Sequence, residues 1–265
     1  MTTASFGAHL REWRQRRRLS QLDLALSAEI SARHLSFIET GRAQPSRDMV
    51  LRLAEHLDVP LRERNILLAA AGFAPAFAQR SLDDPALQTA HKAVELVLRG
   101  HEPFPALAID RHWSLVKANA AVAPLLAGAS AGLLKPPVNV LRLSLHPDGL
   151  APRIANLAEW RAHLLERLRR QVEATADEVL SDLLKELKGY PAPRNAGPAH
   201  PPAEYGGVLV PFRLVTAAGV LSFFSTTTVF GTPLEVTLAE LALETFFPAD
   251  EKTAELVHGM AGKPR

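Results

Sequence analysis

The sequence predicts an α+β protein: an all-α N-terminal domain of five short helices, followed by an α+β domain with an antiparallel sheet. Two observations lead to this prediction. Short amphipathic segments with helical spacing follow one another up to residue 72, and β-branched and aromatic runs between Gly and Pro breaks dominate after residue 200. We expect domains over residues 1–75 and 101–258, joined by a connecting segment and helix over 76–100.

The first domain has clear helix boundary signals. Ser20, Ser31 and Ser46 each stand where a side-chain oxygen can cap a helix start, and Pro60 suits the beginning of a fifth helix. The expected helices run over residues 6–17, 21–28, 31–41, from 46, and 60–72. In the second helix we expect Leu22, Ala25 and Leu26 to form the apolar stripe.

The second domain mixes both kinds of element. We expect helices over 88–99, from 119, over 139–145, over 151–175 and over 177–187. Strands are expected near 105–109, 114–118, 208–216, 219–231 and 235–247, although the Leu spacing of the last segment also fits a helix. Residues 189–207 are expected to form a Pro/Gly-rich loop. Because Phe223 and Phe224 are adjacent, only one of them can face the core side of a strand.

The composition excludes several classes of protein. The chain of 265 residues is 47% apolar and has no Cys, which excludes disulfides and thiol chemistry and fits the cytoplasm. The sequence has no run of about 18 apolar residues, so no membrane partner is expected. The net charge of +2 is uneven, because residues 1–47 carry eight Arg against four acidic residues. A basic end suggests a polyanionic partner.

The stretch "SQLDLALSAEISARHLSFIETGR" explains that basic end. Two short helices joined by a tight turn make a helix-turn-helix, which holds its second helix at an angle suited to a DNA major groove. The stretch resembles the Xre/Cro-repressor family, with Ser20-Gln21, Ile30-Ser31, Ile38-Glu39 and Gly41-Arg42 as matching elements. The resemblance implies a lambda-repressor-like fold that binds double-stranded DNA. Glu29 departs from it, because the family usually has Gly at this turn position.

The resemblance also assigns roles by position. Arg33 is the residue expected to read a base directly, because Arg pairs bidentately with guanine. Gln21 is expected to donate to phosphate or to brace a side chain that contacts a base, and Ser31 to offer its hydroxyl and amide to phosphate. The other expected contacts are Ala32, Ser36 and Phe37 on the outer face of the second helix, and His34, Arg42, Arg14 and Arg17 on the DNA backbone.

The second domain has no catalytic or metal-binding motif in its sequence. HExxH, GxSxG, GxGxxG and phosphate-loop patterns are absent, and the ten His lack metal-ligand spacing. We therefore expect no enzyme activity, no catalytic residues, no metal and no cofactor.

Polar side chains with helical spacing suggest a ligand site instead. Arg142 and His146 share a face of one expected helix, and Asn156 and Trp160 share a face of the next. A cation, an amide, an imidazole and an indole together can hold a carboxylate head group, with the apolar core receiving a tail. The same arrangement can equally pin two helices together.

Longer strings in this domain resemble a known family. "PALAIDRHWSLVKANAAVAPLL" and "PPVNVLRLSLHPDGLAPRIANLAEWRAHLLERLRRQ" are similar to the C-terminal ligand-binding region of the MmyB-like transcriptional regulators, as is "LSFFSTTTVFGTPLEVTLAELALETFFPADEKT". The resemblance implies a PAS-like fold around a small-molecule pocket, and a fatty acid or similar amphiphile as its ligand.

Together these features predict a transcription regulator that binds DNA as a homodimer and senses a small apolar ligand. The alternative is a DNA-binding repressor whose C-terminal domain serves only dimerisation or protein docking. An enzyme fused to a DNA-binding head is a third reading, which the missing motifs disfavour.

Overall fold

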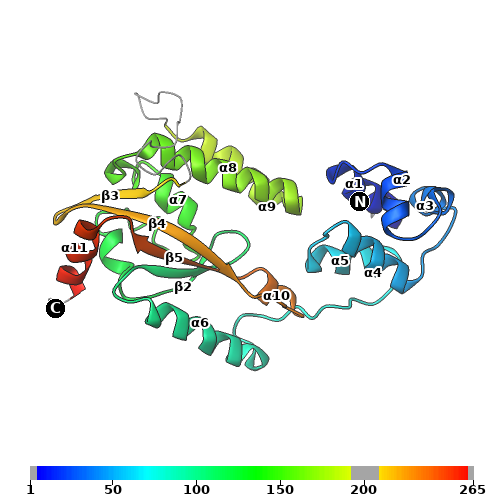
Figure 1. Cartoon of the computed structure of the whole chain (residues 1–265), viewed down its shortest axis with the longest axis horizontal. Coiled ribbons are helices and arrows are strands. Elements are labelled where there is room, and N and C mark those ends of the chain that lie inside the picture. Colours follow the sequence, from blue (N-terminus) through cyan, green and yellow to red (C-terminus); the bar gives the residue numbers. More distant parts are fainter. Residues whose placement is uncertain (1–4, 192–208, 262–265) are drawn as a thin grey trace. The chain divides into compact units, whose positions relative to one another are not determined.

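The computed structural model describes residues 5–191 and 209–261 and divides into two compact units. The first contains the chain up to Leu82 with short additions at 173–175 and 232–239, and the second contains the rest. The predicted fold class is confirmed: five helices precede a domain with an antiparallel sheet and helices (Figure 1). Most of the Pro/Gly-rich loop expected over 189–207 lies outside the described residues.

Four of the first five helices begin after a serine cap, and three of these caps, Ser20, Ser31 and Ser46, are the predicted ones. Ser5, Ser20, Ser31 and Ser46 each accept a hydrogen bond from the backbone N–H three residues ahead, which satisfies an amide that the helix start leaves open. The helices are α1 Phe6–Arg16, α2 Gln21–Ser27, α3 Ala32–Glu39, α4 Arg47–His56 and α5 Leu61–Ala70.

The apolar stripe expected on α2 is confirmed for Ala25 and wrong for Leu22 and Leu26. Leu24 and Ala25 are buried there, whereas Leu22 and Leu26 are 57% and 69% exposed. Because α2 has only seven residues and carries apolar side chains on several sides, periodicity alone does not show which face is buried. The contacts of α2 with α3 and α4 make that selection.

A buried ion pair joins the first three helices. Arg14 of α1 donates to both carboxylate oxygens of Glu39 on α3, at 2.6 and 2.9 Å, and to the carbonyl oxygen of Leu19. Gln21 of α2 donates to Glu39 Oε2 at 2.8 Å. Gly7 lets α1 approach this end of α3, because a Cβ there would lie 2.5 Å from the Glu39 carbonyl oxygen.

The second unit is built on a five-stranded antiparallel sheet. Its strands are β1 Ala106–Ile109, β2 Leu115–Ala118, β3 Phe212–Thr216, β4 Gly219–Val229 and β5 Ala242–Pro248, in the order β2-β1-β5-β4-β3. Two hairpins from distant parts of the sequence therefore meet through β5, which pairs with both β1 and β4. This is the PAS-like domain that the sequence predicts.

Helices pack on both sides of this sheet. Figure 1 shows α8 and α9 above it and α6 below it. Leu164 and Leu168 of α8 and Leu180 of α9 share one buried cluster with Leu214 and Phe223 of the sheet. The helices outside the first five are α6 Gln88–Gly100, α7 Val140–Leu145, α8 Leu157–Thr175, α9 Glu178–Gly189, α10 Val236–Ala239 and α11 Glu251–Ala261.

The structure departs from the expected elements at four places. The helix expected from 151 begins only at Leu157, because Ala155 N–H donates to Arg213 of β3 and holds the chain extended there. The helix expected from 119 is a single 3-10 turn over Ala123–Leu126. The segment 235–247, whose spacing fits both a helix and a strand, contains the short helix α10 and then strand β5. Helix α11 was not predicted. None of the described helices is long and apolar enough to cross a membrane.

We predict that the ion pair between Arg14 and Glu39 stabilises the first unit. Glu39→Gln should lower the free energy of unfolding by about 3 kcal/mol, because it leaves the buried guanidinium without a counter-charge. Urea unfolding followed by circular dichroism measures this. The control is Glu12→Gln, which removes an exposed partner of Arg16 from the same helix and should cost at most about 0.5 kcal/mol.

The pH dependence gives a second readout of the same pair. Burial opposes ionisation of Glu39, but hydrogen bonds from Arg14 and Gln21 outweigh it and hold the pKa of Glu39 below its ordinary value of 4.5. The stabilisation from ionised Glu39 is therefore complete above pH 4.5 and is lost as the pH falls through the lower folded-state pKa. Equal acid sensitivity in wild type and Glu39→Gln would contradict this.

Candidate functional site

Helix α3, the second helix of the predicted helix-turn-helix, presents a small polar and basic surface. Arg33 is exposed, and its guanidinium lies 5.3 Å from the centre of the Phe37 ring, which is partly exposed on the next turn. Among the described residues Arg33 forms no ion pair, so its donors are available to an external acceptor. Ala32, His34 and Ser36 are also partly exposed on this helix.

The start and end of α3 hold two more of the predicted contacts. The Ser31 hydroxyl caps the helix by accepting from the His34 N–H at 3.1 Å, so an anion approaching this end meets a helix N-terminus. Arg42 is exposed just beyond the C-terminal end. Glu29, in the turn between α2 and α3, has a φ of 53°, which is the left-handed conformation that favours Gly.

Three predicted contacts have partners inside the first unit. Arg14 is buried on Glu39, so its guanidinium cannot reach phosphate, and the predicted backbone contact is corrected here. Gln21 donates to the same carboxylate, which is a bracing role. Arg17 lies over the Trp13 ring and donates to the carbonyl oxygens of Leu57 and Asp58, so it ties α1 to the turn before α5.

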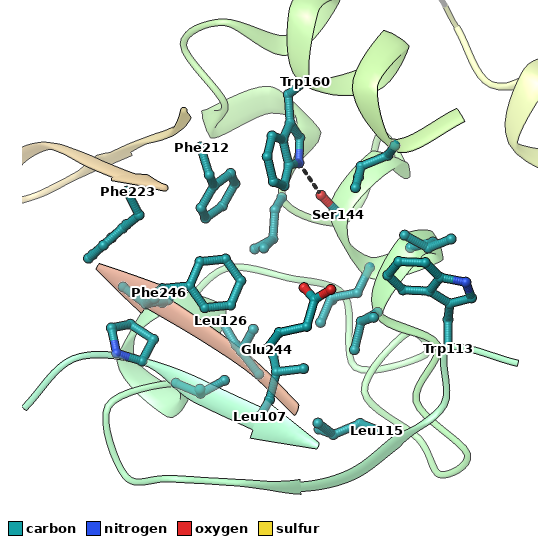
Figure 2. Close-up of a pocket in the computed structure, with 18 residues that line it drawn as sticks. Leu107, Trp113, Leu115, Leu126, Ser144, Trp160, Phe212, Phe223, Glu244 and Phe246 are labelled. Carbon is teal, nitrogen blue, oxygen red and sulfur yellow. Dashed lines mark hydrogen bonds between the residues drawn. The ribbon is translucent and has the colours of Figure 1, made fainter. Parts of the chain in front are cut away.

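The second unit contains an apolar cavity of about 100 Å³ between the sheet and helices α7 and α8 (Figure 2). Phe223 faces this cavity, and Phe224 stacks on Phe247 with the ring centres 5.5 Å apart, as expected for adjacent residues of one strand. Typical ligand pockets enclose roughly 300–1,000 Å³, so this cavity is small. Its lining residues are Pro105, Leu107, Trp113, Leu115, Val122, Leu125, Leu126, Val140, Leu141, Leu143, Ser144, Leu150, Trp160, Leu164, Phe212, Phe223, Glu244 and Phe246.

One acidic side chain points into this apolar space. Figure 2 shows the Glu244 carboxylate in the middle of the ring of apolar side chains. Glu244 lies on β5 and is only 7% exposed. Its Oε1 forms an ion pair with Arg167 of α8, whose guanidinium lies 4.5 Å from the centre of the Trp113 ring. A buried carboxylate needs such a partner, because burial alone disfavours its charge.

The hydrogen-bond donors around the cavity are mostly engaged within the protein. Trp160 donates from its indole to Ser144 Oγ at 3.0 Å, and Trp113 donates to Gln171 Oε1 at 2.7 Å. The second Nη of Arg167 donates to Thr227 Oγ1 at 2.8 Å. Ser144 therefore has its oxygen occupied by Trp160, while its hydroxyl proton can turn toward an acceptor.

Of the four ligand residues predicted from the sequence, Trp160 lines the cavity and the other three do not. Arg142 donates three hydrogen bonds to Glu186 of α9, which lower the pKa of that carboxyl below its ordinary value. His146 packs edge-on against Tyr190. The side chain of Asn156 bonds to Pro211 O and Arg213 N, where it ties the start of α8 to β3.

The sequence reasoning missed Glu244 and Ser144. A signal for Glu244 was present, because it is the single charged residue in the strand "LALETFFP". A lone acid in a half-buried strand needs a partner, and α8 supplies Arg167 from far away in the sequence. The described residues contain no cluster of three side chains suited to a metal ion.

Comparison with protein families assigns both units. Residues 90–258 match the MmyB-like transcription regulator ligand binding domain, which is more than half of the chain. The chain belongs to the MmyB-like transcription regulators. Residues 5–67 match a helix-turn-helix domain, so the first unit is a DNA-binding module of a regulator. The predicted helix-turn-helix and the predicted resemblance to the MmyB-like regulators are thereby confirmed.

Comparisons with individual proteins add little. One solved structure is the clp gene regulator ClgR from Corynebacterium glutamicum, which is 26% identical over 37% of this chain and 90% of that chain. Its TM-score of 0.23 is too low to support an argument about the fold. No curated protein matches the sequence.

The contacts of Arg142 lead to a prediction that separates an architectural role from ligand binding. Arg142→Ala should lower stability by at most about 1 kcal/mol, because both members of its pair are partly exposed. It should leave the affinity for an apolar ligand unchanged, because the guanidinium lies outside the cavity lining. Trp160→Ala is the matched variant that should change it. Ligand titration by calorimetry measures the affinity of both variants. A tenfold loss of affinity in Arg142→Ala would show that Arg142 contributes to ligand binding.

Proposed function

We propose that this chain is a sequence-specific transcription regulator that reads DNA through residues 1–75 and holds a small, largely apolar ligand in residues 101–258. The observation that supports the ligand most directly is the cavity, in which two polar side chains and two indoles interrupt an otherwise apolar lining. The protein acts in the cytoplasm and binds as a homodimer to an operator with two-fold related half-sites about one helical turn apart.

Ligand sensing requires a difference in affinity. A ligand changes DNA binding only if it binds the DNA-competent and DNA-incompetent forms of the dimer unequally. A fatty acid or similar amphiphile, which the family resemblance implies, suits the apolar lining of the cavity. The cavity is also small for a long acyl chain, so such a ligand requires the lining side chains to move.

The free guanidinium of Arg33 makes it the residue that we expect to read a base. Arg33→Ala should remove about 1–3 kcal/mol of discrimination at one operator position per half-site, because it removes a bidentate pair with guanine. Selection of binding sites from random DNA, compared between wild type and variant, measures this. The control is Arg16→Ala, an exposed Arg on α1 paired with Glu12, which should preserve the preference. An unchanged preference in Arg33→Ala would exclude direct readout by this residue.

Arg42 provides a test of backbone contact. Arg42→Ala should weaken binding to all sequences alike and reduce the dependence of log K on log salt by about one, because it removes one phosphate contact. Fluorescence anisotropy with one operator and one unrelated duplex, over a range of salt concentrations, measures both effects. A flat salt response in the wild type would contradict DNA as the partner.

The ligand-binding proposal is tested by extraction of the purified protein with denaturing solvent and mass spectrometry of the extract. We expect a stoichiometric apolar molecule, which should shift the affinity for the operator when added back. If nothing is extracted and no apolar compound alters DNA affinity, the second domain serves dimerisation or protein docking only.

A further inference from the structure

A second apolar space adjoins the inner cavity, the one between the sheet and helices α7 and α8. This outer groove has a volume of about 570 Å³ and lies between the segment before β1, the turn Ala123–Leu126, β4 and α11. Its volume falls within the range of roughly 300–1,000 Å³ that is typical of ligand pockets, whereas the inner cavity, at about 100 Å³, is smaller than that range.

Two side chains separate the inner cavity from the outer groove. Pro105 and Leu125 line both spaces, so the wall between them is one side chain thick at these residues. On β4, Phe223 lines the inner cavity and Leu221 lines the outer groove, and residues two apart on a strand share a face of the sheet. The two spaces therefore follow one another along the same face of the sheet.

Polar side chains hold the backbone on both sides of this wall. Asn119 donates to the carbonyl oxygen of Phe104 at 2.8 Å, directly before Pro105. Arg153 donates to the carbonyl oxygen of Leu125 at 2.5 Å. Pro105 has a closed ring, whereas Leu125 has two side-chain torsions with several staggered rotamers. The side chain of Leu125 is therefore the part of the wall that can move.

The lining of the outer groove suits an aliphatic chain. Its described lining residues are Pro, Ala, Leu, Val and Met, with Glu102 as the one charged residue among them. The Glu102 carboxylate accepts from the Ala120 N–H at 3.2 Å. These residues offer no cation to an anionic head group, so the burial of apolar surface is the main interaction that they can provide.

We propose that an unbranched aliphatic ligand fills the inner cavity and continues past Leu125 into the outer groove, which thereby sets the preferred chain length. The inference rests on the proposed function, because it assumes that the inner cavity holds part of the ligand. Each methylene group that enters the groove is removed from water, which favours longer chains until the groove is filled.

The test compares hexanoate with dodecanoate on the full-length protein stripped of bound lipid. Calorimetric titration should show dodecanoate binding at least about 100-fold more tightly, because each additional buried methylene group strengthens binding by up to about fourfold. Affinities within about threefold of each other in the wild type would overturn the inference without any variant.

Ala123→Trp is the informative variant, because Ala123 is exposed, lines the outer groove and lies outside the inner cavity. The indole should fill the groove, lower the affinity for dodecanoate about 10- to 100-fold and leave the affinity for hexanoate unchanged. Ala261→Trp should do the same from the exposed end of α11, so a folding defect at one position does not decide the result.

The matched control is Ala127→Trp, which changes an exposed residue directly after the same turn that lines neither space. It should keep the wild-type preference for dodecanoate. The inference is wrong if both groove variants retain that preference in full, or if Ala127→Trp loses it to the same extent.

Failure of the inference differs from failure of the proposed function. If hexanoate and dodecanoate bind the wild type with similar affinity, the inner cavity is a ligand site that does not continue into the outer groove. If neither acid binds the wild type at concentrations up to about 1 mM, both the ligand-binding function and the inference fall.

Discussion

The buried carboxylate of Glu39 links the first three helices of the DNA-binding unit, and their packing depends on it. Arg14, Gln21 and Glu39 come from three different helices, each too short to be stable alone. A buried carboxylate with one strong partner tolerates little movement, because losing the hydrogen bonds leaves a charge without solvation. The pair therefore fixes the angle of α3, and with it the direction in which Arg33 points.

The ligand-binding unit also contains a buried carboxylate, that of Glu244 on β5. Residues two apart on a strand face the same side of a sheet, so Glu244 faces the same side as Phe246. A carboxylate on that side has to be compensated, and Arg167 reaches it from α8. The result is an apolar cavity with one ion pair in its wall.

Because the cavity is small, a ligand can enter it only if the surrounding side chains move. A ligand larger than about 100 Å³ is accommodated only by displacing side chains that line the cavity. Close-packed interiors transmit such displacements because they have little free space. Under the proposed function, such a displacement is what would make the affinity for the ligand differ between two arrangements.

Local signals in the sequence determined much of this protein. Three serine caps placed three helices, the spacing of "SQLDLALSAEISARHLSFIETGR" identified the helix-turn-helix, and β-branched runs located β3 and β4. These features act within a few residues of one another, so they can be read from the order of the chain.

Only the tertiary structure decided which side chains meet. Arg14 and Arg16 lie two residues apart on α1, yet one is buried on Glu39 and the other is paired with the exposed Glu12. Arg142 and Asn156 had the right helical spacing for a site, but their partners, Glu186 and Arg213, come from elements that periodicity cannot place. Glu244 and Arg167 are 77 positions apart and meet because β5 occupies the centre of the sheet. Helical and strand periods report which residues share a face, but they carry no information about what that face packs against.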